Sequence, residues 1–127
     1  MNPMVILRAL CYLCVIQTCI WFKGFAGLYR YVRNKRTVGR VANRPSLKTL
    51  VSNFHLARHL YPNPRAKCLH LAAAYGLLSR HYGWPVDVVI GVARLSRPFF
   101  AHAWVECDGK AVYGVFDASK YVVLDRL

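Results

Sequence analysis

The hydrophobic pattern of the chain changes its period once, at Gly83-Trp84-Pro85. Before this point apolar residues recur at helical spacing, whereas after it they alternate with the period of two that is typical of β-strands. Helices followed by strands predict an α+β fold, with N-terminal helices and then a small antiparallel sheet. The 127 residues suffice for one domain with its own hydrophobic core.

Three helices are expected ahead of this change. Ser46 is a suitable N-cap for the second helix, and the prolines at 62 and 64 must end it. In the third helix, Cys68 falls on the apolar face near the start. The predicted helices cover about Met4–Phe22, Leu47–Leu60 and Pro64–Tyr82.

Four strands are expected after the change, and we predict that they form an antiparallel meander. Asp108-Gly109 is a strong signal for a two-residue hairpin turn between the second and third strands. The predicted strands cover about Val86–Ala93, Phe99–Cys107, Ala111–Phe116 and Tyr121–Leu124.

The first predicted helix is long and apolar enough to cross a bilayer, and seven basic residues follow it between Lys23 and Arg44. Arg8 opposes insertion, because a charged side chain is costly inside a membrane. Three interpretations stay open: a helix that covers the domain or a partner protein, a peripheral membrane helix, and a membrane span. We divide the chain into this helix with its basic connector, residues 1–45, and a globular domain, residues 46–127.

The charge of the chain is strongly unbalanced, with 18 lysine and arginine residues against 5 aspartate and glutamate residues, a formal net charge of +13. Such an excess attracts acidic peptides, anionic lipids or nucleic acids. The basic residues lack the interleaved aromatics of a base-stacking surface, so nucleic acid is not expected as a partner.

Three of the five cysteines, Cys11, Cys14 and Cys19, lie in the apolar run. This placement is unlike a secreted disulfide framework and indicates a reducing, cytoplasmic location. Cys11 and Cys14 form a C-x-x-C pair, but no second pair and no nearby histidine completes a zinc site. We therefore expect buried structural thiols, with no metal and no cofactor.

Cys68 and His102 are the candidate nucleophile and base. A thiol becomes a strong nucleophile as a thiolate, which a nearby imidazole or a helix N-terminus stabilises. Of the five histidines, His102 is the one in a predicted strand. It shares a strand face with Trp104 and Glu106, whereas small residues occupy the other face. A structural role for each remains the alternative: Cys68 as a small core residue, His102 as a hydrogen-bonded group.

Asp117 is the candidate acid that orients the imidazole. A turn centred on Asp108-Gly109 pairs Trp104 with Tyr113 and places Asp117 one diagonal step from His102, roughly 7 to 8 Å away. Glu106 shares the face but lies about 13 Å along the strand. The prediction depends on register, because a shift of one residue reverses the face.

These residues resemble a known family. The motifs resemble those of the lasso-peptide leader peptidases, the protease part of the lasso B proteins in the transglutaminase-like superfamily, and the similarity is close from about Arg65 to Leu127. The residues that carry it are Arg65-Ala66-Lys67-Cys68-Leu69, Leu77-Leu78, Gly83, Gly91-Val92, His102-Ala103-Trp104-Val105-Glu106 and Asp108-Gly109.

The resemblance implies a papain/transglutaminase-like fold and a cysteine peptidase, in residues 46–127, that removes the leader from a ribosomally made lasso-peptide precursor. Cys68 matches the nucleophile, His102 the base and Asp117 the acid. Implied partners are the precursor, a separate leader-binding RiPP recognition element and a lasso cyclase. Two alternatives stay open: amide transfer of the transglutaminase type, and a non-catalytic basic module associated with membranes.

Overall fold

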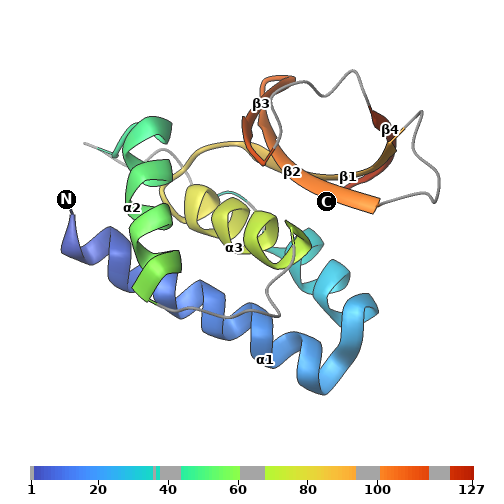
Figure 1. Cartoon of the computed structure of the whole chain (residues 1–127), viewed down its shortest axis with the longest axis horizontal. Coiled ribbons are helices and arrows are strands. Elements are labelled where there is room, and N and C mark those ends of the chain that lie inside the picture. Colours follow the sequence, from blue (N-terminus) through green and yellow to red (C-terminus); the bar gives the residue numbers. More distant parts are fainter. Residues whose placement is uncertain (1, 36, 38–43, 61–67, 94–100, 115–120) are drawn as a thin grey trace.

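The computed structural model describes residues 2–35, 37, 44–60, 68–93, 101–114 and 121–127. Helices precede a four-stranded antiparallel sheet, which confirms the predicted α+β class (Figure 1). The helices are α1 (Pro3–Asn34), α2 (Leu47–Leu60) and α3 (Cys68–His81), and the strands are β1 (Val86–Ala93), β2 (Ala101–Cys107), β3 (Lys110–Tyr113) and β4 (Tyr121–Arg126).

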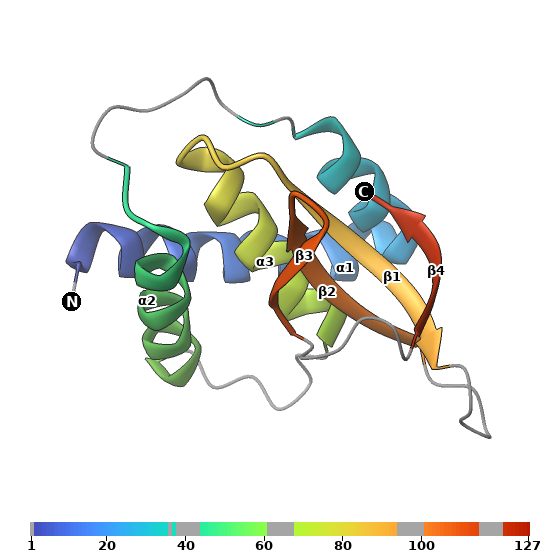
Figure 2. The ribbon, with the colours of Figure 1, turned by 90° about the horizontal axis from the view of Figure 1, so that it is seen from above.

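Helix α3 lies between the sheet and the first part of α1, and α2 packs beside it (Figures 1 and 2). Its small residues allow this close packing: Ala72, Ala73 and Ala74 are fully buried. A Cβ atom added to Gly76 would lie 2.6 Å from Cγ2 of Val88 in β1. One hydrophobic core joins α1 with α2, α3 and the sheet, so the boundary predicted at residue 45 separates two stretches of sequence that share this core.

Helix α1 extends well beyond the predicted Met4–Phe22. The Asn2 side chain caps it by accepting hydrogen bonds from the amides of Met4 and Val5. The helix bends at Gly24, where φ is 68° and ψ is −170°, a backbone region essentially restricted to glycine. The prediction that Cys11 and Cys14 are buried is wrong, because both side chains are exposed on α1.

The strand order is β3-β2-β1-β4. The predicted meander is therefore wrong for β4, which pairs with β1 and not with β3. Strand β1 takes the centre because Val88, Val89 and Ile90 are all buried, and consecutive buried residues require cover on both faces of the sheet.

The turn from α3 into β1 follows the glycine signal in the sequence. Gly83 has a φ of 84°, its amide donates to the carbonyl of Arg80, and the Trp84 amide donates to the carbonyl of Ser79. These two bonds form a Schellman motif, which ends a helix at a glycine. Helix α2 matches the predicted range, and α3 ends one residue before its predicted end.

A buried arginine fixes this end of the molecule. Arg80 is 7% exposed, and burial lowers the pKa of its guanidinium group. Its nitrogens donate to the carbonyl oxygens of Val32 (2.8 Å) and Lys35 (3.1 Å) near the end of α1, of Val86 (3.0 Å) in β1, and of Leu127 after β4. One side chain therefore joins α1, α3 and both strands of the β1–β4 pair.

We predict that Arg80→Met lowers the free energy of unfolding by about 3–5 kcal/mol, because it leaves buried carbonyl groups without donors. Arg80→Lys should recover only part of the loss, since an ammonium group cannot reproduce the planar set of donors. Urea denaturation measures both. Arg30→Met, at an exposed position, is the control and should change stability by less than about 0.5 kcal/mol; an equally small effect at Arg80 would contradict the prediction.

Candidate functional site

The two faces of the sheet have different environments. Val88 and Val105 are register partners and lie against Gly76 of α3. His102, Trp104 and Glu106 occupy the opposite face, as the alternation in the sequence predicted. The sheet curls so that this second face is its hollow side, turned away from α3 (Figure 1).

His102 is the second residue of β2 and pairs with Gly91 of β1. Its ring is stacked on Tyr121, with centroids 5.4 Å apart and an interplanar angle of 19°, and on Trp104 at 6.4 Å and 26°. The Nε2 atom lies 3.0 Å from the carbonyl oxygen of Gly114. The ring is thus held by aromatic neighbours and by one polar contact, while it remains partly exposed.

The carbonyl contact fixes the tautomer of His102. A carbonyl oxygen only accepts hydrogen bonds, so in the neutral ring Nε2 carries the proton and donates it to Gly114. The lone pair is then on Nδ1, which is the nitrogen able to take a proton from a nucleophile. Gly114 has a φ of 99°, a conformation that favours glycine and directs this carbonyl toward the ring.

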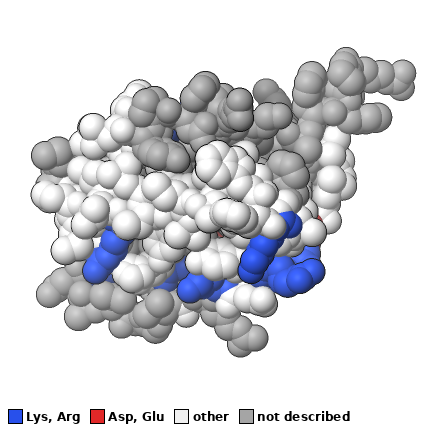
Figure 3. Space-filling model, turned by 90° about the horizontal axis from the view of Figure 1, so that it is seen from below, with Lys and Arg blue, Asp and Glu red and all other residues white. Residues whose placement is uncertain are grey.

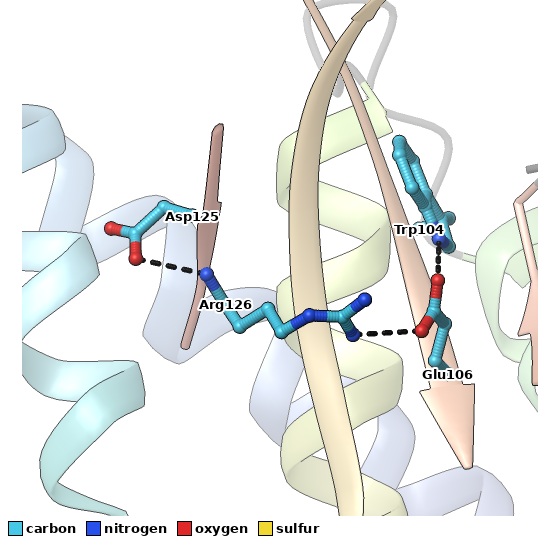
Figure 4. Close-up of polar contacts among 4 residues, drawn as sticks. All are labelled: Trp104, Glu106, Asp125 and Arg126. Atoms are coloured by element: carbon cyan, nitrogen blue, oxygen red, sulfur yellow. Dashed lines mark hydrogen bonds and ion pairs between the residues drawn. The ribbon is translucent and has the colours of Figure 1, made fainter. Parts of the chain in front are cut away.

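The buried carboxylate of Glu106 fixes the position of the Trp104 ring (Figure 4). Glu106 is 4% exposed and accepts hydrogen bonds from Nε1 of Trp104 and from Nη1 of Arg126, each at 2.7 Å. Burial acts to raise the pKa of Glu106, but the hydrogen bonds from Arg126 and Trp104 outweigh it, so the pKa lies below its usual value. The carboxylate therefore stays charged and holds Trp104 against His102.

The absence of a side chain at Gly91 leaves room for the Trp104 ring. A Cβ atom at this position would lie 2.6 Å from Cη2 of Trp104 and 2.9 Å from the carbonyl oxygen of Val122. No side chain fits there, because such distances are shorter than any real Cβ contact. Gly91 thus has a packing role directly opposite His102.

Cys68 is the first residue of α3 as described; its side chain lies outside the described part of the structure. Gly76 of α3 lies over Val105 of β2. Measured from this contact, Cys68 is about 12 Å away along α3, and His102 is about 10 Å away along β2. Both residues lie toward the same end of the helix–sheet pair (Figures 1 and 2).

This placement changes the predicted meeting point of the two groups. The His102 ring lies on the face of the sheet away from α3, so a contact with the Cys68 thiol has to form around the end of β2. It cannot form through the face that packs on the helix, which Ala103 and Val105 fill. The contact between thiol and imidazole itself stays a prediction.

The predicted hairpin register is correct at the turn and wrong beyond it. Cys107 pairs with Lys110 as expected, but Val105, not Trp104, pairs with Tyr113 because a bulge shifts the register. Tyr113 consequently turns to the helix side, where its ring stacks on Tyr75 at 4.9 Å. The register argument for the predicted acid therefore fails; Asp117 lies outside the described residues, and its role now rests on the family resemblance.

Three contributors to the site were missed at the sequence level: Tyr121, Gly114 and Arg126. Each comes from a strand or turn whose position depends on the bulge or on the β1–β4 pairing. Gly114 carried the one available signal, since a glycine within a strand pattern often marks a bulge. Among the described residues, no group of three or more His, Cys, Asp or Glu side chains is arranged to hold a metal ion.

Comparison with protein families matches residues 11–125 to the transglutaminase-like superfamily. The match begins within α1 and ends within β4, so it includes both Cys68 and His102. Comparisons with curated proteins and with solved structures gave no match.

We predict that Glu106→Gln lowers stability at neutral pH by about 1–2 kcal/mol, because the charge-assisted bond from the half-exposed Arg126 is lost. The pKa of Glu106 is depressed by folding, so its contribution is present above the unfolded pKa and is lost as pH falls through the folded one. The difference between the two proteins should therefore shrink below about pH 4. Urea denaturation across this range measures it, and a difference independent of pH would refute the assignment.

Gly91→Ala should displace Trp104 and cost about 1–3 kcal/mol, because the added methyl group overpacks the site. Near-ultraviolet circular dichroism would report the loss of the fixed Trp104 environment. Gly109→Asn is the matched control: the space around Gly109 is open although its φ is 79°, and asparagine tolerates that conformation. An unchanged spectrum in Gly91→Ala would contradict the described packing.

Proposed function

Because the chain belongs to the transglutaminase-like superfamily, we propose that it is a cysteine peptidase with Cys68 as nucleophile and His102 as base. The superfamily is associated with cysteine protease and transglutaminase-type activity. Both chemistries begin when a thiolate attacks an amide carbonyl. The resemblance of the Cys68 and His102 motifs to lasso-peptide leader peptidases favours one substrate, the bond between leader and core in a ribosomally made precursor.

The observation that carries this proposal is the orientation of His102. Its Nε2 atom is engaged by Gly114 at 3.0 Å, which leaves the Nδ1 lone pair for the reaction. The ring packs against both Trp104 and Tyr121, which also contact each other, so little rotational freedom is lost when it acts. His102 lies at the end of the sheet that is near the start of α3, where Cys68 is located.

The proposed reaction has two steps. His102 takes the thiol proton, the Cys68 sulfur bonds to the carbonyl carbon, and the imidazolium returns the proton to the leaving amine of the core. Water then attacks the thioester with His102 as base, which releases the leader as a free carboxylate and restores the thiol. The backbone amide of Cys68 is a suitable donor to the oxyanion in both steps.

The remaining assignments of the proposal come from the resemblance. Asp117 is the acid, and it supports the imidazole through its charge and not through a ring nitrogen, because Nε2 is bonded to Gly114 and Nδ1 serves the thiol. A leader-binding recognition element delivers the precursor, and a lasso cyclase receives the released core. Amide transfer would share the first step and differ only in the second, where an amine replaces water. Mass spectrometry separates the two, because hydrolysis yields a leader carboxylate and transfer yields a crosslink.

We predict that Cys68→Ala and His102→Ala each reduce precursor cleavage by about a thousandfold or more, measured with the recognition element present. Asp117→Ala should reduce it less completely. Circular dichroism should show an intact fold in each variant. Cys14→Ala and His59→Ala, at exposed positions on α1 and α2, are the matched controls and should cleave normally. Full activity of Cys68→Ala would refute the mechanism.

A further inference from the structure

Helix α1 has an apolar face that the other described residues leave uncovered. Most of its exposed apolar side chains recur at intervals of three or four residues, which places them on one side of a helix, and the exposed polar Thr18 interrupts the series. The exposed fractions are large, 71% for Trp21 and 81% for Phe22. The other members are Met4, Leu7, Cys11, Cys14 and Val15. We call these seven residues the outer stripe.

The opposite side of α1 is part of the hydrophobic core. Val5, Ala9 and Ile16 are at most 1% exposed and belong to the same cluster as the residues of α2 and α3. A helix that is apolar on both sides requires cover on both. The hydrophobic core covers the inner side of α1, whereas no described residues cover the outer stripe.

The first segment of α1, Pro3–Gly24, is long and apolar enough to cross a membrane, but its contacts oppose a span. Arg8 donates a 2.8 Å hydrogen bond to the hydroxyl of Tyr82, and the Asn2 amide donates to Asn53 at 2.9 Å. Insertion across a bilayer would break both bonds and remove the core residues of α1 from α2 and α3. These contacts are retained if the helix lies parallel to a membrane surface.

A basic hollow adjoins the aromatic end of the outer stripe. It has a volume of about 320 Å³ and is lined by Lys23, Arg30 and Lys35 together with Gly27, Tyr31 and Asn34. Helix α1 contains no acidic residue. Seen from the α1 side, the described surface shows lysine and arginine side chains among uncharged ones and barely any acidic side chain (Figure 3). A cationic hollow beside exposed Trp21 and Phe22 matches the chemistry of the boundary between anionic headgroups and acyl chains.

We propose that α1 is a peripheral membrane-binding helix that lays its outer stripe on an anionic lipid bilayer and takes lipid phosphate groups into the hollow of Lys23, Arg30 and Lys35. The sheet lies on the far side of α3 from the contact (Figure 1), so the His102 face is directed away from the lipid. The inference is independent of the proposed peptidase activity, and its test needs no precursor.

Charge argues against a second copy of the chain as the cover. Two copies joined through their outer stripes would each bring a net charge of +13. Such like-charge contacts are unfavourable. An anionic bilayer supplies both an apolar layer for the stripe and the opposite charge for the basic hollow at its end.

The test uses the full chain with two kinds of vesicle, phosphatidylcholine alone and phosphatidylcholine with phosphatidylglycerol. We expect cosedimentation with the anionic vesicles and a blue shift of tryptophan emission. Trp21 should be the source, since Trp104 is fully buried and Trp84 is partly covered. Trp21→Phe should abolish the shift while binding persists.

Two variants separate the two parts of the surface. Lys23→Gln with Arg30→Gln should weaken binding to the anionic vesicles about thirtyfold, given about 1 kcal/mol for each cation near a charged surface. Phe22→Ser with Leu7→Ser should weaken it at least tenfold. The controls remove comparable groups from the sheet: Lys110→Gln, which is exposed, and Leu124→Ser, at 62% exposure. Both should bind as the unmodified chain does.

Three outcomes would overturn the proposal. The first is no binding to the anionic vesicles. The second is an equal loss in the Lys110→Gln control, which would indicate attraction by net charge alone. The third is a stable dimer in solution, detected by analytical ultracentrifugation, in which Trp21 is already shielded, which would identify a second copy as the cover.

Discussion

The buried guanidinium group of Arg80 fixes how the helices and the sheet are placed relative to one another. Backbone carbonyls from the end of α1, from β1 and from the residue after β4 all turn toward the end of α3, and each accepts a hydrogen bond from Arg80. Burying a charge is unfavourable unless its hydrogen bonds are made. Because Arg80 makes four, this end of the molecule allows only one arrangement of its elements.

The candidate site lies at the other end of α3, about 18 Å of helix away from Arg80. The helix and the central strands transmit the fixed geometry to that end through close packing, above all where Gly76 meets Val88 and Val105. On the far face of the sheet, Glu106 orients Trp104, and Trp104 with Tyr121 orients His102. The imidazole is therefore positioned by the buried Trp104 and Glu106 and by the half-buried Tyr121, none of which takes part in the proposed reaction.

The two sides of α1 also have different roles. Its inner side contributes Val5, Ala9 and Ile16 to the core, and its outer side remains apolar with basic neighbours. Exposing Trp21 and Phe22 to water is energetically unfavourable for a soluble domain. Their exposure is best explained by an external surface that covers them. Membrane attachment through α1 and chemistry at the sheet would then occupy opposite sides of one small domain.

Local patterns predicted most of the elements correctly. The range of α2 and the range of β1 match the sequence prediction, and the glycine turn ends α3 within one residue of its predicted end. Alternation along β2 also placed His102, Trp104 and Glu106 on one face. These features depend on neighbours within a few residues, and such neighbours can be read directly from the sequence.

The amino-acid sequence by itself determined the α+β class, the apolar and basic character of α1, and the two residues with thiol and imidazole chemistry. Only the tertiary structure decided that β4 joins β1, that a bulge turns Tyr113 toward the helices, and that the carbonyl of Gly114 selects the tautomer of His102. Strand neighbours and bulges depend on contacts between distant residues, and a shift of one position reverses a face. The same limit applied to α1, since composition revealed an apolar helix and only packing showed which side of it the other described residues leave exposed.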